Sequence, residues 1–249
     1  PFCSTGLIVT EVGSGLFVGS GSLVGRRTVL TASHISYDFD NLTWYTGQEF
    51  ALAFNQSITN VFYHSVPTAG MMKLAAYSQA TADGNEVLAF NADVLTLYSL
   101  SDLGTQTVDY SIQYYNTPCL AAEEWRSILV GYPSNDFALA IANPGRMFVT
   151  GPNNWAFGDY LSIAESDTVN DNLGTAHDSY GTARALYVGV DELAVYRGNS
   201  GGPLLGLDPD LGTYTQTALV VGSNNESSPV TALFRVINSA AYQLIQSAT

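Results

Sequence analysis

Residues 197–204 read Arg-Gly-Asn-Ser-Gly-Gly-Pro-Leu, and this octet constrains the fold more than any other part of the chain. Glycines at positions 198, 201 and 202 permit backbone conformations that other residues rarely adopt. Such a turn can expose the hydroxyl of Ser200 and aim the amides of Gly198 and Ser200 at one point, where a developing oxyanion is stabilised. The octet is therefore a candidate nucleophile turn. Its Gly-x-Ser-x-Gly core also fits the nucleophile elbow of α/β-hydrolases, and a plain tight turn in a β-protein.

The positions of the histidines separate these alternatives. A serine nucleophile needs a base, usually a histidine that a carboxylate orients. The chain has three histidines, His34, His64 and His177, and all of them precede Ser200. The α/β-hydrolase order requires a histidine after the serine and is excluded. The subtilisin order, Asp then His then Ser, stays open to His64 and His177, because no aspartate precedes His34. The order His, Asp, Ser is open to all three.

Local sequence favours His34 and one aspartate. Residues 28–34 read Thr-Val-Leu-Thr-Ala-Ser-His, a β-branched strand that runs into a turn of small residues and ends on His34. Residues 92–97 read Ala-Asp-Val-Leu-Thr-Leu. Asp93 thus begins an apolar strand, where a carboxylate can be buried against an imidazole.

These three segments resemble the trypsin-like serine proteases of the chymotrypsin fold. That family carries Thr-Ala-x-His, then an aspartate before an aliphatic strand, then Gly-x-Ser-Gly-Gly-Pro. The resemblance implies that His34 is the general base, Asp93 its orienting carboxylate and Ser200 the nucleophile. It also implies that the amides of Gly198 and Ser200 form the oxyanion hole. His64 and His177 are then expected in structural or loop positions.

Some residues differ from the family pattern, and these differences indicate particular branches of the family. Asn199 stands where animal trypsins have the aspartate that pairs with the N-terminal ammonium, so we expect no activation switch of that kind. Ile35 and Ser36 replace the half-cystine that usually follows the histidine. These differences, with Ile-Leu-Val-Gly-Tyr-Pro at 128–133, look more like the bacterial-type and glutamyl-endopeptidase branches.

The resemblance also suggests which residues bind substrate. In this family the primary pocket is formed largely by the residues five and six positions before the nucleophile, here Val195 and Ala194. Neither offers the aspartate that would pair with a substrate Lys or Arg. The later pocket strand, within 218–225, contains no histidine to hold an acidic side chain, and we expect Val221 to face the pocket. Cleavage after uncharged, mainly apolar residues is predicted.

The expected fold is all-β, with two six-stranded antiparallel β-barrels and a C-terminal helix. We place the first barrel, carrying His34 and Asp93, in residues 1–115 and the second, carrying Ser200, in residues 116–249. Short β-rich runs alternate with turn clusters, as in a sandwich or barrel. Apolar residues between 236 and 245 recur at helical spacing. The expected strands are 6–12, 15–24, 28–32, 86–90, 94–100, 127–132, 146–150, 183–190, 204–207, 216–222 and 231–236.

The amino-acid composition excludes some classes of binding partner. The 249 residues carry a formal charge of −14 and a single lysine, Lys73, which argues against nucleic acid or an anionic membrane as partner. No apolar run approaches the roughly 18 residues of a spanning helix. Residues 167–179 are rich in Asn and Asp but lack the spacing of a calcium loop, so we expect no metal and no cofactor. Protein or peptide substrates and a monomeric state are expected.

Three features suggest secretion. Residues 1–3 read Pro-Phe-Cys, which is typical of a processed chain. We expect Cys3 and Cys119 to form a disulfide, because the chain has only these two cysteines and some family members tie an N-terminal segment to the inter-barrel region. Weaker support comes from sequons at Asn41, Asn55 and Asn225.

The sequence thus predicts a secreted serine endopeptidase. Two alternatives remain open. A non-catalytic binding module on a protease fold would predict a broken triad, whereas all three residues are present. An esterase using the same triad would be distinguished by parallel assays of ester and amide substrates.

Overall fold

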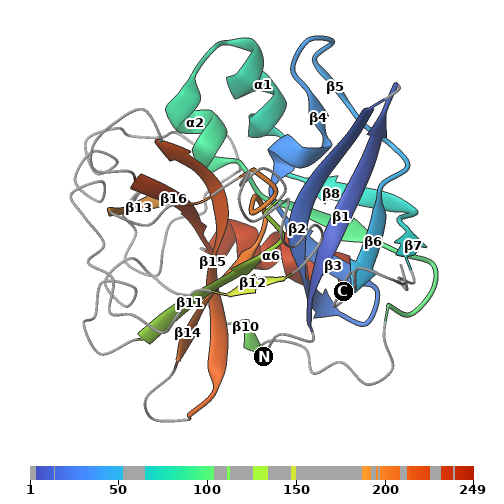
Figure 1. Ribbon diagram of the computed structural model, residues 1–249. Helices are drawn as coiled ribbons and strands as arrows, with labels where there is room; N and C mark the ends of the chain where they lie inside the picture. Colours follow the sequence, from blue (N-terminus) through green and yellow to red (C-terminus); the bar gives the residue numbers. More distant parts are fainter. Residues whose placement is uncertain are drawn as a thin grey trace.

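The chain forms two β-sheets that lie side by side, with one helix packed across both (Figure 1). The computed structural model describes residues 4–13, 15–52, 65–103, 111–112, 126–133, 147–149, 187–191, 195, 197–207, 212–224, 231–237 and 239–249. The predicted all-β architecture with a C-terminal helix is confirmed.

The first sheet closes on itself as a barrel. Its strand order is β7-β6-β1-β2-β3-β9-β8, so β7 and β8 lie at opposite edges. Only Thr68 and Ala69 separate these two strands, and the two amides donate to Gln48 O and Tyr98 O, on either side of the seam. Counting β7 and β8 as one bent strand gives the six strands predicted. The strands are β1 (Thr5–Val12), β2 (Gly15–Gly25), β3 (Thr28–Thr31), β6 (Glu49–Leu52), β7 (Ser65–Pro67), β8 (Gly70–Lys73) and β9 (Leu95–Tyr98).

The second sheet has six strands on its main path, in the order β12-β11-β14-β15-β16-β13. A further two-residue strand, β10, pairs in parallel with β15. This strand precedes residue 115 yet joins the second sheet, and the boundary between the halves stays a prediction. The strands are β10 (Ser111–Ile112), β11 (Arg126–Gly131), β12 (Phe148–Val149), β13 (Tyr187–Asp191), β14 (Pro203–Leu207), β15 (Tyr214–Asn224) and β16 (Thr231–Val236).

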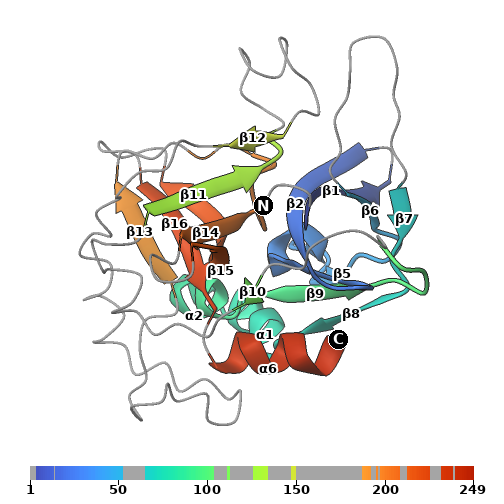
Figure 2. The same cartoon turned by 90° about the horizontal axis from the view of Figure 1, so that it is seen from below.

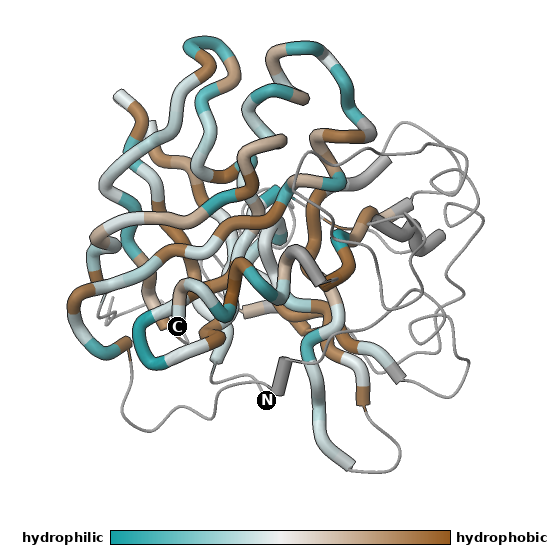
Figure 3. The backbone as a smooth tube through the Cα atoms, turned by 180° about the vertical axis from the view of Figure 1, so that it is seen from behind, coloured by the Kyte–Doolittle hydropathy of each residue, from teal (hydrophilic) through white to brown (hydrophobic). Residues whose placement is uncertain are grey.

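Each sheet buries its own apolar cluster, and the apolar stretches follow the strands (Figure 3). Alternation is visible in β16, where Ala232, Phe234 and Val236 are buried in the second cluster. The first cluster is made of Ile8, Leu23, Val29, Ile35, Phe50, Leu95, Leu97 and Leu103.

A third cluster joins the two halves. The C-terminal helix α6 (Ser239–Ala248) contributes Ala241, Leu244 and Ile245. These pack with Leu30 of β3 and Leu219 of β15, and α6 lies along the lower edge of the view in Figure 2. Helix α6 therefore stabilises the contact between the sheets.

The sequence prediction was wrong at residues 86–90, which form helix α2 (Glu86–Asn91) instead of a strand. The Asn85 side chain accepts a hydrogen bond from Leu88 N at 3.0 Å, which caps the first turn. A second short helix, α1 (Ala76–Ala82), precedes it. A small hairpin of β4 (Tyr37–Asp38) and β5 (Thr43–Trp44) lies at the same end of the first barrel (Figure 1).

Leu97→Ala should lower the free energy of unfolding by about 2–5 kcal/mol, because Leu97 is fully buried in the first barrel and truncation leaves a cavity. Denaturant titration measures this change. Leu100, three residues on, is 78% exposed, and Leu100→Ala should change stability by less than about 0.5 kcal/mol. Equal effects of the two substitutions would contradict the described core.

Candidate active site

Strand register brings His34 and Asp93 to the same end of the first barrel. Strands β3 and β9 are antiparallel neighbours, with Thr31 opposite Leu95. His34 lies three residues after Thr31, in a 3₁₀ turn spanning Ser33–Ser36, and Asp93 lies two residues before Leu95. Ser33 Oγ donates to Val94 O at 3.0 Å and ties the two segments together.

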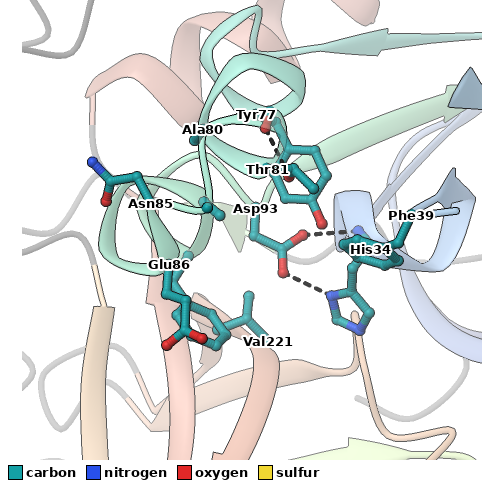
Figure 4. Close-up of a pocket in the computed structure, with 12 residues that line it drawn as sticks. His34, Phe39, Tyr77, Ala80, Thr81, Asn85, Glu86, Asp93 and Val221 are labelled. Carbon is teal, nitrogen blue, oxygen red and sulfur yellow. Dashed lines mark hydrogen bonds and ion pairs between the residues drawn. The ribbon is translucent and has the colours of Figure 1, made fainter. Parts of the chain in front are cut away.

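The two carboxylate oxygens of Asp93 bind two nitrogens of one residue. Asp93 Oδ2 lies 2.7 Å from His34 Nδ1, and Asp93 Oδ1 accepts from the His34 backbone amide at 3.0 Å (Figure 4). The Asp93 side chain is only 3% exposed, whereas the His34 side chain is 24% exposed. The carboxylate therefore fixes both the position of the ring and a proton on Nδ1, which leaves Nε2 as the basic nitrogen.

Burial and charge act in opposite directions on His34. Burial alone would lower the pKa of His34, but the negative charge of Asp93 and the hydrogen bond to it outweigh burial. The pKa of His34 is therefore raised above its ordinary value. An imidazole in this setting accepts a proton more readily than one in water.

Glycines shape the loop that carries Ser200. Gly198 has φ +94° and Gly201 has φ +78°. A Cβ at Gly201 would lie 2.1 Å from Thr31 Oγ1, so only glycine fits against the end of β3. Gly201 N donates to Val220 O at 2.8 Å, and Ser200 O accepts from Ser20 N at 2.7 Å. The half-exposed Ser200 thus lies where the two sheets meet, beside the strand that leads to His34.

The amides of Gly198 and Ser200 flank Asn199 in this loop. Within the described ranges, no backbone carbonyl accepts from either amide. Asn199 itself is 1% exposed, and neither polar atom of its amide has a partner in the part of the chain that the structure describes. The side chain at this buried position is neutral, and the expectation that no N-terminal ammonium pairs with it stays a prediction, because residues 1–3 lie outside the described ranges.

A mainly apolar cavity of about 430 Å³ opens beside His34 and Asp93 (Figure 4). Val221 of β15 forms one wall, and its predicted place in the primary pocket beside residues 194 and 195 stays a prediction. The opposite walls come from the helical segment that the sequence did not predict. Phe39, between β4 and β5, also lines the cavity. The lining residues from the helical segment are Tyr77, Ala80, Thr81, Gly84, Asn85, Glu86, Ala89 and Phe90.

Tyr77 is a site residue that sequence reasoning missed. It is 2% exposed, and its ring packs edge-on against Tyr37, with centroids 5.4 Å apart. Burial, followed by the negative charge of Asp93, raises the pKa of the Tyr77 phenol, so the phenol stays neutral. Figure 4 shows its ring extending toward the Asp93 carboxylate. Apolar residues at helical spacing around residue 77 were the one feature of the sequence that could have indicated this site residue.

The other predicted residues fall into two groups. Val195 is buried in the core of the second sheet, and Asn41 is exposed and hydrogen-bonded to Asp38. Residues outside the described ranges are Ala194, His64, His177, Cys3, Cys119, Asn55 and Asn225.

Neither a cluster of metal-binding side chains nor a membrane-spanning helix is found among the described residues. No group of three or more His, Cys, Asp or Glu side chains there is arranged to hold a metal ion. Within the same ranges, no helix combines the length and apolarity that crossing a membrane requires.

No protein-family model and no curated protein sequence matches the chain significantly. Solved structures do match it over nearly its whole length. A Glu endopeptidase in complex with MPD has a TM-score of 0.66 and 13% identity, covering 100% of this chain and 91% of the other. The thermostable serine protease AL20 from an extremophilic microorganism has a TM-score of 0.64 and 16% identity, with 99% and 97% covered.

Protease Anisep from Arthrobacter nicotinovorans has a TM-score of 0.62 and 16% identity, with 100% and 96% covered. At these identities the likeness shows the fold, and it agrees with the bacterial-type resemblance drawn from the sequence. The chain has the chymotrypsin-type double-barrel fold found in these proteases.

Proposed function

We propose that this chain is a serine endopeptidase. Ser200 Oγ attacks the carbonyl carbon of a peptide bond while His34 Nε2 takes the hydroxyl proton. His34 then gives this proton to the leaving amine, and water releases the acyl group by the reverse sequence. Asp93 holds the imidazole in the useful tautomer and stabilises the imidazolium.

The observation that carries this proposal is the double contact of Asp93 with His34. A carboxylate that needs only to be neutralised can bind any nearby donor. Here its two oxygens bind Nδ1 at 2.7 Å and the backbone amide of the same residue at 3.0 Å. This geometry holds the imidazole ring at its Nδ1 and turns Nε2 away from the carboxylate. A general base requires this arrangement.

The loop around Ser200 supplies the second requirement, stabilisation of negative charge. We assign the amides of Gly198 and Ser200 to the oxyanion hole. The positive φ of Gly198 gives the loop a shape that a residue with a side chain rarely adopts. Preorganised amides of this kind stabilise the tetrahedral intermediate without reorganising during the reaction.

The cavity beside His34 suggests the class of substrate. Its walls include the aromatic rings of Phe39, Tyr77 and Phe90, and among the residues that the structure describes Glu86 and Asp93 are the acidic ones that line it. We propose that an apolar side chain of a peptide substrate occupies it. Cleavage after uncharged, mainly apolar residues is a separate proposal, which rests on the uncharged residues at 194 and 195 and not on this cavity. Secretion, a monomeric state and a disulfide between Cys3 and Cys119 belong to the same proposal. The serine proteases of like fold support the peptidase activity in this proposal.

Ser200→Ala should leave folding intact and reduce peptidase turnover by several orders of magnitude. Folding is spared because the Ser200 contact with Ser20 is made by the backbone carbonyl, which alanine keeps. The measurement is kcat on amide and ester substrates in parallel, with a phosphonylating reagent and mass spectrometry to locate the label. Ser101 is exposed, and Ser101→Ala is the control variant that should keep the wild-type turnover. Near-normal turnover of Ser200→Ala refutes the proposed function.

The pH profile of kcat/KM should have a rising limb set by His34. Because Asp93 raises the pKa of His34 above its ordinary value of about 6.5, the neutral base forms only at higher pH. Asp93→Asn removes the negative charge, so the midpoint should move to lower pH. Its kcat should fall by about 10⁴-fold, since the wrong tautomer results.

Asp102→Asn is the matched control for this experiment. Asp102 pairs with Arg26 and Arg27 at the surface, outside the site. Loss of the Asp102 charge should leave the rising limb of the pH profile of kcat/KM at its wild-type midpoint. An unchanged midpoint in Asp93→Asn would contradict the role given to that carboxylate.

Ala89→Phe should narrow the cavity and reduce kcat/KM by about tenfold or more for substrates whose large apolar side chain enters it. Substrates with a small residue at that position should be spared. A peptide-library profile of each variant measures the change. Ala82→Phe, on an exposed position of α1, is the control. A wild-type profile dominated by Arg, Lys or Glu before the cleaved bond would overturn the proposed preference.

A further inference from the structure

Ser20 is a fully buried residue of β2 whose polar groups are all used near the Ser200 loop. Its hydroxyl donates to Gly198 O at 2.6 Å and accepts from Tyr132 N at 2.8 Å. Its backbone amide donates to Ser200 O at 2.7 Å. One residue of the first barrel therefore binds a carbonyl on each side of Asn199.

The third polar group of Ser20, its backbone carbonyl, extends this network toward His34. Ser20 O accepts from Thr31 Oγ1 at 2.7 Å, and Thr31 is the last residue of β3. Ser20 thus links the strand that leads to His34 with the loop that carries Ser200.

The loop needs such an external anchor. Gly198 has no side chain, and at φ +94° its backbone can turn to other conformations at little steric cost. The Asn199 amide has no partner among the described residues that would restrain the loop. The hydrogen bonds from Ser20 hold the carbonyls of Gly198 and Ser200, and so restrict rotation of the segment that bears both amides.

We propose that Ser20 is a positioning residue for the oxyanion-stabilising amides of Gly198 and Ser200. The inference rests on the proposed function, since it assigns a catalytic effect to a residue that does not touch the substrate. Loss of the Ser20 hydroxyl leaves the loop in place through the backbone bonds from Ser20 N to Ser200 O and from Gly201 N to Val220 O, but lets Gly198 reorient. The penalty then falls on the transition state and spares substrate binding.

Ser22 offers a matched control on the same strand. It lies two residues from Ser20 and therefore on the same face of β2. It is also fully buried, and its hydroxyl donates across the interface to Gln216 Oε1 at 2.7 Å. Ser22 contacts β15 and not the nucleophile loop. Ser20→Ala removes two buried hydrogen bonds of the hydroxyl, to Gly198 O and from Tyr132 N, whereas Ser22→Ala removes one, to Gln216 Oε1.

The experiment compares Ser20→Ala and Ser22→Ala for kcat, KM, unfolding by denaturant and inhibition by a peptidyl boronic acid, which forms a tetrahedral adduct. Ser20→Ala should lower kcat by about 10–1000-fold, with KM within about threefold of wild type. Its inhibition constant for the boronic acid should rise in step with the loss of kcat/KM. Ser22→Ala should also lose stability, because it breaks a buried hydrogen bond between the sheets, and should keep the wild-type kcat.

Ser20→Cys provides a second variant in case Ser20→Ala does not fold. The thiol fills the site and donates weakly, so kcat should lie between wild type and the alanine variant. A kcat of a folded Ser20 variant equal to wild type overturns the inference alone, as does an equal loss in Ser22→Ala. Wild-type protein that neither cleaves peptides nor reacts with serine reagents overturns the proposed function, and the inference with it.

Discussion

The candidate active site depends on the contact between the two large sheets, which have no strand in common. His34 and Asp93 belong to the first barrel and Ser200 to the second, so their relative positions depend on the interface. Hydrogen bonds from Ser20 to Gly198 O and Ser200 O fix the interface at the Ser200 loop, whereas the bond from Ser22 to Gln216 joins the two sheets outside that loop. Buried polar bonds of this kind are directional, whereas apolar contact alone would permit sliding.

Charge imposes the second constraint. A carboxylate as buried as Asp93 must be hydrogen-bonded, because an unpaired buried charge is strongly unfavourable. The structure provides two donors from His34, and the neutral Tyr77 closes the site from the helical side. The same arrangement that makes the buried carboxylate tolerable also orients the imidazole. Stability and the proposed chemistry therefore rely on the same contacts.

The sequence predicted those parts of the molecule that local patterns determine. The octet at 197–204 and the segment at 28–34 carry their conformations in their glycines and β-branched residues. Residues 86–90 were assigned to a strand because their apolar content fits both elements, and the cap from Asn85 decides for a helix. The roles of Tyr77 and Ser20 could not be predicted, because they arise from contacts between distant segments and not from local pattern.

The measurement that tests the central claim most directly is a comparison of kcat for wild type, Ser200→Ala, His34→Ala and the double variant. If the two residues act as one unit, the double variant should be no slower than the worse single variant by more than a few-fold. Both single losses should reach several orders of magnitude. Losses that multiply in the double variant would show that the residues act independently and would contradict the account.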